Sequence, residues 1–158
     1  MNKRFFKFAR EAAMMATYRG SHNFKPMIGA VAVYKGSIAA TAYNTNKTSP
    51  LQAKYNIYRY KDTDTLAKAH AETTLIQKLR WKFGDSIDWS KIHIYLYREY
   101  KNGELAPSRP CPGCMAMLKE LGIKTIYYTT ESGYAKEEIK GSVCRRTVFS
   151  GNHCSVYQ

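Results

Sequence analysis

The chain has 158 residues, of which 44% are hydrophobic, so it can form the core of one ordinary domain and is not a disordered chain. No run approaches the ~18 apolar residues of a membrane span, and Arg10-Glu11 interrupts any signal-peptide core. We therefore expect a cytoplasmic protein with no membrane partner. Lysine and arginine total 25 against 12 acidic residues, and the net charge of +13 favours a polyanionic partner.

The first part of the chain predicts a helix followed by a hairpin. Apolar residues recur at close to helical spacing over 5–19, and a polar, glycine-containing stretch at 20–23 ends the pattern. Residues 27–34 are a nearly continuous apolar run, which is typical of a buried central strand. After a Lys-Gly turn, residues 37–43 return as its partner strand. The following stretch, 44–64, is basic and is expected to be irregular.

The second part predicts alternating helices and strands. We expect helices over 66–79, 110–121 and 135–140 and strands over 92–97 and 125–130, with Gly122 as the C-cap of the second of these helices. A strand-helix-strand order implies a right-handed crossover between parallel neighbours. The predicted fold is therefore an α/β/α sandwich whose mixed sheet contains an antiparallel hairpin followed by parallel strands. No repeat or long linker is visible, so we expect one domain over 1–158, with a core at about 4–140 and a tail at about 141–158.

Two short motifs carry the chemistry. Residues 70–72 read His-Ala-Glu, and residues 110–114 read Pro-Cys-Pro-Gly-Cys. One histidine and two cysteines suit a tetrahedral zinc ion that keeps its fourth position open for water. Cys111 and Cys114 lie on one face of a first helical turn, where the helix dipole favours thiolates. Glu72 can move protons to and from that water without being a ligand.

These motifs, with the hairpin sequence over 28–44, give the chain a resemblance to the cytidine deaminase-like superfamily, which includes the deoxycytidylate, tRNA-adenosine and APOBEC-like deaminases. The resemblance implies a three-layer α/β/α sandwich with a mixed five-stranded sheet. It also implies a zinc cofactor and hydrolytic removal of a ring amine by zinc-bound hydroxide. The implied roles are zinc ligation by His70, Cys111 and Cys114, proton transfer by Glu72, a sugar contact by Asn44, and a site lined by the backbone of Ala71 and Cys111.

The substrate is predicted from basic and aromatic residues near these motifs. Such side chains together can follow a phosphate backbone and stack bases. Four candidates lie upstream of the histidine: Lys47, Lys54, Tyr55 and Arg59. A fifth, Arg109, lies beside the cysteines. They favour cytosine in single-stranded DNA or RNA as the substrate. Free deoxycytidylate or cytidine mononucleotide is the alternative, and adenosine in tRNA is a third. A solvated loop whose tyrosines pack on the core, without a binding role, also remains open.

Two other functions fit parts of the sequence. C-x-x-C at the start of a helix is also a redox motif, but a redox site leaves residues 70–72 unexplained. A zinc-containing nucleic-acid-binding module without catalysis would use a closed site of four ligands, and no fourth ligand is evident beside the three. Cys144, His153 and Cys154 are expected to be ordinary residues of the tail, with a second metal site as the alternative.

Overall fold

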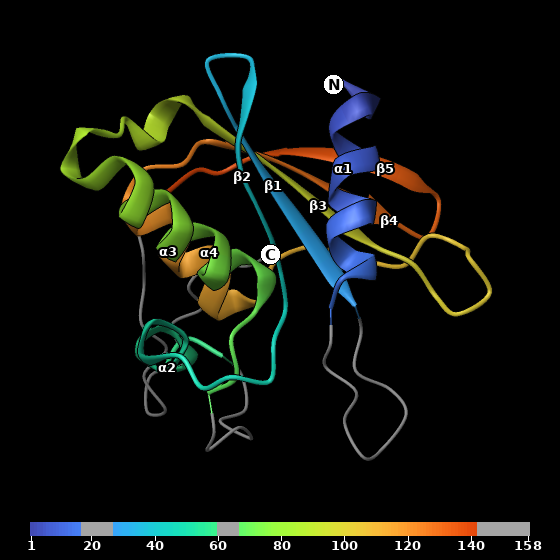
Figure 1. Cartoon of the computed structure of the whole chain (residues 1–158), viewed down its shortest axis with the longest axis horizontal. Helices are drawn as coiled ribbons and strands as arrows, with labels where there is room; N and C mark the ends of the chain where they lie inside the picture. Colours follow the sequence, from blue (N-terminus) through green and yellow to red (C-terminus); the bar gives the residue numbers. More distant parts are fainter. Residues whose placement is uncertain (17–26, 60–66, 142–158) are drawn as a thin grey trace.

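The computed structural model describes residues 1–16, 27–59 and 67–141, which form a five-stranded sheet with helices on both faces (Figure 1). The helices are α1 (Lys3–Met14), α2 (Pro50–Asn56), α3 (Ala71–Phe83) and α4 (Pro112–Leu121), with short 3-10 turns η1 (Gly84–Ser86) and η2 (Trp89–Lys91). The strands are β1 (Ile28–Tyr34), β2 (Ser37–Tyr43), β3 (Ile92–Arg98), β4 (Thr125–Thr130) and β5 (Gly133–Glu138).

The sheet is mixed, as predicted, with the strand order β2-β1-β3-β4-β5. Strand β1 pairs antiparallel with both β2 and β3, whereas β3 and β4 are parallel. The connection between the two parallel strands contains α4. The ends of β3 and β4 therefore lie at the same edge of the sheet as the beginning of α4, which is where ligands commonly bind in α/β folds.

The two faces of the sheet contact different helices. In β1, Val31 and Val33 pack with Phe6 of α1, while Ala30 and Ala32 belong to the core beneath α3 and α4. Because side chains alternate along a strand, one apolar strand serves both cores. Figure 1 shows α1 on one side of the twisted sheet and α3 with α4 on the other. The three-layer α/β/α prediction and the five-stranded sheet are confirmed.

The predicted helix over 135–140 is wrong. Residues of this stretch instead form β5, which pairs antiparallel with β4 along its whole length, from Gly133 opposite Thr130 to Glu138 opposite Thr125. The sequence Ala-Lys-Glu-Glu favours a helix by intrinsic propensity. A tight turn directly after β4 brings it against the free edge of that strand, and backbone pairing there outweighs the propensity.

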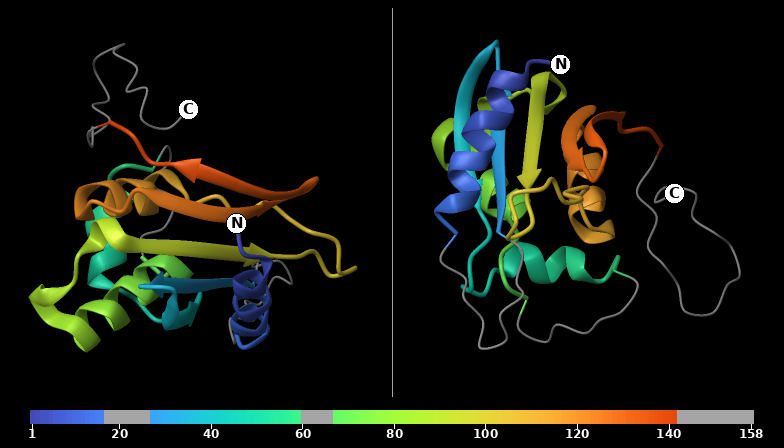
Figure 2. Two further views of the ribbon diagram at one scale, coloured as in Figure 1. Left: turned by 90° about the horizontal axis from the view of Figure 1, so that it is seen from above. Right: turned by 90° about the vertical axis from the view of Figure 1, so that its right-hand side faces the viewer.

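The prediction of irregular structure over 44–64 is also wrong in part, because α2 lies inside it. Ser49 is the N-cap of this helix and accepts a hydrogen bond from the backbone N–H of Gln52, and Pro50 occupies its first turn. Figure 2 shows α2 lying across one end of the sheet. Seven residues without a clear apolar period gave little sequence signal for a helix.

The predicted helix bounds are correct in part. Helix α3 begins at Ala71 rather than at 66, because the backbone of Ala69 bonds to Thr45 and Lys47 in an extended pairing. Helix α1 ends at Met14, and the remaining predicted positions from 17 onward lie outside the described residues. Helix α4 ends as predicted at Gly122, whose φ of 91° suits glycine. None of the helices that the structure describes has the length and apolar character of a transmembrane segment.

Candidate metal centre and substrate cavity

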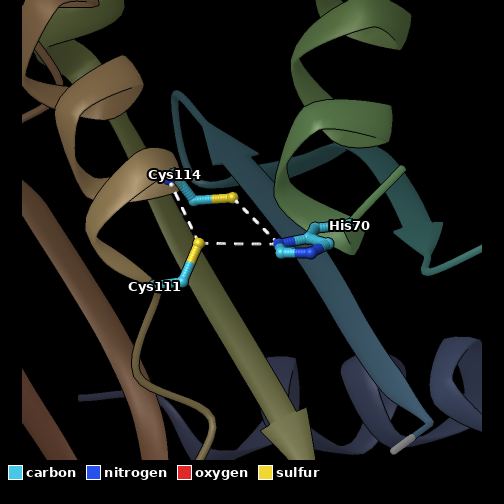
Figure 3. A group of neighbouring side chains, drawn as sticks. All are labelled: His70, Cys111 and Cys114. Atoms are coloured by element: carbon cyan, nitrogen blue, oxygen red, sulfur yellow. Dashed lines mark hydrogen bonds between the residues drawn. The ribbon is translucent and has the colours of Figure 1, made fainter. Parts of the chain in front are cut away.

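His70, Cys111 and Cys114 meet where the first turns of α3 and α4 face each other. His70 is the N-cap residue of α3, and Cys111 is the N-cap residue of α4. The Nδ1 atom of His70 lies 3.6 Å from Sγ of Cys111 and 3.5 Å from Sγ of Cys114. Figure 3 shows the imidazole ring pointing at both sulfur atoms. Two motifs separated by about forty residues of sequence therefore form one cluster.

The spacing of these three atoms fits a zinc ion. With Zn–S of ~2.3 Å and Zn–N of ~2.0–2.1 Å, tetrahedral angles place a sulfur and a nitrogen ligand about 3.5 Å apart. The two observed sulfur–nitrogen distances are 3.6 and 3.5 Å, and all three candidate ligand atoms lie within 4.8 Å of one another. Among the described residues, no fourth histidine, cysteine or carboxylate joins this group. The donor set suits zinc with one position open to a small molecule.

The cysteine-bearing end of α4 is organised by its own sequence. Pro112 stands in the first turn, and Sγ of Cys111 accepts a hydrogen bond of 3.4 Å from the backbone N–H of Cys114. The pKa of Cys111 is lowered well below its usual range, chiefly because Cys114 donates to its sulfur and the His70 ring adds a further hydrogen bond. A lowered thiol pKa favours the thiolate form that binds metals.

The segment that leads into Cys111 is fixed to the ends of β3 and β4 by Ser108. Its Oγ donates to the backbone carbonyl of Leu96 at 3.0 Å and accepts from the backbone N–H of Thr129 at 2.8 Å. The backbone N–H of Ser108 in turn donates to the carbonyl of Thr129. Ser108 is buried, so these bonds hold the lead-in segment in one position.

Glu72 is buried in the first turn of α3 beside this cluster. It is 3% exposed, and its Oε2 atom has no hydrogen-bond partner in the part of the chain that the structure describes. Burial raises the pKa of Glu72 to about 7, despite the opposing effect of the positive charge on His70. A buried carboxyl group without a partner is costly unless a ligand or water completes it. Its position suits proton exchange with a molecule in the adjoining cavity.

A cavity of about 360 Å³ opens beside the cluster. Its walls come from the end of β2, the segment before α3, the end of β3 and the lead-in to α4. The lining residues are Ile28, Asn44, Thr45, Arg59, Lys68, Ala69, His70, Glu72, Arg98, Pro107, Ser108, Arg109 and Cys111. The volume is in the range of small-molecule sites.

Four of the lining residues are lysine or arginine: Arg59, Lys68, Arg98 and Arg109. Arg109 forms a two-pronged ion pair with Glu137 of β5, with both nitrogen–oxygen distances at 2.8 Å. Arg98 donates from Nη1 to the carbonyl of Pro107 at 3.3 Å. Its Nε atom is buried and lacks a partner among residues 1–16, 27–59 and 67–141. The cavity lining therefore contains more positive than negative charge.

The predicted substrate-binding residues are divided between the cavity and other places. Asn44, Arg59 and Arg109 line the cavity. The Oδ1 atom of Asn44 accepts from the backbone N–H of Ile28 at 2.8 Å, which fixes its amide at the start of the hairpin. Ala71 is fully buried directly beside His70 but is not part of the cavity lining.

The remaining predicted substrate contacts lie outside the cavity lining. Lys47 and Lys54 are exposed, and Lys54 lies over the ring of Tyr55 at 5.2 Å. Tyr55 is 2% exposed and packs in the core beneath α3 and α4. The residues proposed for the tail, Cys144, His153 and Cys154, lie outside the described residues.

Sequence reasoning did not select four residues that organise the site. Lys68 and Ser108 line the cavity, Glu137 pairs with Arg109, and Gln52 bonds to the backbone of His70. Lys68 lies two positions before the histidine, so proximity was an available signal. Gln52 and Glu137 act through contacts between distant segments, for which the sequence contains no local pattern.

Comparisons with known proteins agree with this geometry. Residues 2–130 match the family model described as the cytidine and deoxycytidylate deaminase zinc-binding region. Among solved structures, the chain is similar to cytidine deaminase from Burkholderia pseudomallei, with 19% identity, 87% of this chain and 92% of that chain covered, and a TM-score of 0.57. It is also similar to dCMP deaminase from the cyanophage S-TIM5 in apo form, with 22% identity, 80% and 79% covered, and a TM-score of 0.52. No match is found among curated protein sequences. At these identities the two structures show a shared fold.

Proposed function

This chain belongs to the cytidine and deoxycytidylate deaminase family, and from that premise we propose that it deaminates the cytosine of a phosphorylated nucleotide. The reaction consumes water and yields the uracil nucleotide and ammonia. The observation that carries the proposal is that Arg59, Lys68 and Arg98 share one cavity with His70 and Glu72. Cationic side chains beside a reacting centre favour a substrate with a phosphate group.

In this proposal His70, Cys111 and Cys114 hold the zinc ion through Nδ1 and the two thiolates. The chemistry that zinc supplies when it is bound is the activation of a water molecule at neutral pH. The protein keeps both cysteine sulfurs and the imidazole in place through the first turns of α3 and α4. Among the described residues no fourth ligand joins the three, so a bound zinc ion would keep a position for water.

Glu72 is the proposed proton carrier. Its buried Oε2 accepts one proton from the attacking water and passes it to the ring nitrogen. It then accepts the second proton of the same oxygen as the carbonyl forms and passes it to the amine, which departs as ammonia. A pKa of about 7 suits a group that must both accept and donate protons near neutral pH. Asn44 remains the proposed contact for the sugar, since its amide is fixed at the cavity wall.

A free mononucleotide is the proposed substrate form. The cationic side chains of the cavity support it. A mononucleotide carries a phosphate close to its base, and this phosphate would bind Arg98 of the cavity lining. Cytosine in a single-stranded polynucleotide is the second candidate. The net charge of +13 and the exposed Lys47 and Lys54 favour it.

The test compares three substrates with the zinc-loaded protein: deoxycytidylate, deoxycytidine and a single-stranded oligonucleotide that contains cytosine. We expect the highest kcat/KM for deoxycytidylate. Faster conversion of the oligonucleotide would support the second candidate instead. If none of the three yields uracil, the proposal is contradicted, and adenosine in tRNA becomes the next substrate to test.

Arg98→Gln sharpens the test by removing the guanidinium. The ratio of kcat/KM for deoxycytidylate to kcat/KM for deoxycytidine should fall about 10–100-fold, the value of a hydrogen bond to a charged group. Lys54→Gln is the matched control, because it removes a cation outside the cavity lining. It should leave the ratio unchanged and should reduce oligonucleotide turnover if the second candidate is correct. An unchanged ratio in Arg98→Gln would remove Arg98 from phosphate recognition.

A further inference from the structure

Gln52 of α2 is a buried polar side chain that contacts the candidate metal ligands His70 and Cys114 without being a ligand itself. It is 0% exposed. Its Oε1 atom accepts hydrogen bonds from the backbone N–H of His70 at 3.2 Å and from Oγ1 of Thr73 at 3.0 Å. The sulfur of Cys114 lies 4.0 Å from the same oxygen. One amide oxygen therefore contacts the histidine, the following helical turn and one of the two cysteines.

The orientation of this amide is determined by its partners. A backbone N–H can only donate, so the atom that faces His70 must be the oxygen. The Nε2 atom then donates to Oδ1 of Asn56 at 2.9 Å, one turn further along α2. Both ends of the amide are satisfied, which a fully buried polar group requires. The side chain is thus held in a single position.

The backbone N–H of His70 has Gln52 as its acceptor, and the side chain of His70 makes no capping hydrogen bond to α3. On its carbonyl side, His70 accepts hydrogen bonds from the backbone N–H of Thr74 at 3.1 Å and from Oγ1 of Thr74 at 3.0 Å. On its amide side, Gln52 supplies the bond. The peptide groups on both sides of the histidine are therefore fixed, and the imidazole projects from a backbone that cannot rotate freely.

Helix α2 also touches the cysteine-bearing helix. A Cβ atom at Gly113 would lie 2.7 Å from the backbone oxygen of Tyr55, so the two helices approach as closely as glycine permits. The same short helix thus contacts α3 through Gln52 and α4 through Tyr55. Its position between the two helix ends is suited to setting the distance between the histidine and the cysteines.

We propose that Gln52 is a positioning residue for the metal centre, acting through the backbone of His70 and through the spacing of α3 from α4. The inference rests on the proposed function, because it takes His70, Cys111 and Cys114 to be zinc ligands. Residues that orient metal ligands typically contribute 10–100-fold to metal affinity.

The test measures metal binding rather than turnover. Gln52→Met keeps the length of the side chain and removes the acceptor for His70. Gln77→Met is the matched control, because Gln77 is exposed on α3 and bonds only weakly, at 3.4 Å, to Ser49. Zinc affinity is measured by competition with a chromophoric chelator, and ligand geometry by the absorption spectrum of the cobalt-loaded protein. We expect Gln52→Met to bind zinc about 10–100-fold more weakly, with shifted cobalt bands, and Gln77→Met to match the parent.

Parental zinc affinity and an unchanged cobalt spectrum in Gln52→Met would overturn the proposal. If that variant does not fold, Asn56→Ala takes its place, since it removes the partner that anchors Nε2 of Gln52. It should weaken zinc binding in the same direction by a smaller factor, and parental binding would again overturn the proposal. A parent protein that binds zinc but converts no cytosine nucleotide would contradict the proposed function alone. A parent that binds no zinc would contradict both.

Discussion

The two helix ends that face the metal site are constructed in different ways. At the cysteine end, residues 111–114, Cys111 caps its own helix by accepting from the N–H of Cys114, and Pro112 stands in the first turn. At the histidine end, residues 70–74, no side chain of the helix caps it, and the N–H of His70 bonds to Gln52, 18 residues away. The first arrangement is local, and the second is tertiary.

This difference indicates which end of the site depends on residues of another helix. A cap formed within four residues should persist whenever α4 forms. A peptide held by a residue of another helix moves when that helix moves. We therefore expect the histidine end to be sensitive to changes in α2, and the cysteine end to respond mainly to changes in its own residues.

The largest expected effect comes from the histidine end itself. Glu72→Gln removes the group that carries protons while keeping the size of the side chain. Turnover of deoxycytidylate should fall by about 10²–10⁴-fold, the usual contribution of a general acid–base group. Zinc content, measured by atomic absorption, should stay at the parental value because Glu72 is not a proposed ligand. Retained turnover would exclude Glu72 as the proton carrier, and loss of zinc would show that it supports the ligands instead.

The contact between α2 and the cysteine end gives a second, smaller effect. In Gly113→Ala the new Cβ would meet the backbone oxygen of Tyr55 at 2.7 Å, so α2 or α4 must shift. Overpacking of this kind typically lowers the free energy of unfolding by about 1–3 kcal/mol, which denaturant unfolding can measure. Ala53→Ser, at an exposed position of α2, is the control and should change little.

The same variant tests whether α2 couples the two ends. Because α2 carries Gln52, a changed distance between α2 and α4 should weaken zinc binding as well as destabilise the protein. A variant that is destabilised but binds zinc as tightly as the parent would show that α2 does not couple the two ends.

The zinc motif could be predicted from the sequence because its geometry is largely local. Cys111 and Cys114 share one helical turn, and His70 and Glu72 stand at the start of another, so residue spacing alone places their side chains. The hairpin of β1 and β2 could also be predicted, since a continuous apolar run followed by Lys-Gly and a second run is a local pattern. The grouping of His70 with Cys111 and Cys114 and the layered fold were therefore predicted together.

The surroundings of the motif could not be predicted in the same way. Residues 135–138 of β5 have strong helix propensity, and pairing with the edge of β4 makes them a strand. In the sequence Tyr55 is an aromatic residue within a basic segment, but in the structure α2 places its side chain in the core. In both cases pairing or packing with a distant segment determines the structure, and such contacts leave no periodic signal.

The smallest expected effect tests whether the lead-in to the cysteine end has its own tertiary support. Glu137 of β5 accepts two hydrogen bonds from Arg109 and one, at 2.9 Å, from the hydroxyl of Tyr128. These bonds, Arg109 first, hold the pKa of Glu137 below its ordinary value of 4.5. Because the pKa is lowered in the folded state, the ion pair stabilises the protein fully above the unfolded value and ceases to do so as pH falls through the folded one.

Glu137→Gln should therefore lower the free energy of unfolding by about 1 kcal/mol at pH 7. The difference in free energy of unfolding between variant and parent should become smaller as the pH falls below 4.5. Denaturant unfolding across a pH series would measure this difference. Glu104→Gln, at an exposed loop position, serves as the control and should show no such trend. A gap that stays constant with pH would mean that the ion pair contributes nothing. Zinc affinity should remain parental in Glu137→Gln. Arg109 precedes the cysteine end, and the cap that forms this end lies wholly within residues 111–114. A weakened affinity would show that the cysteine end, too, depends on a distant strand.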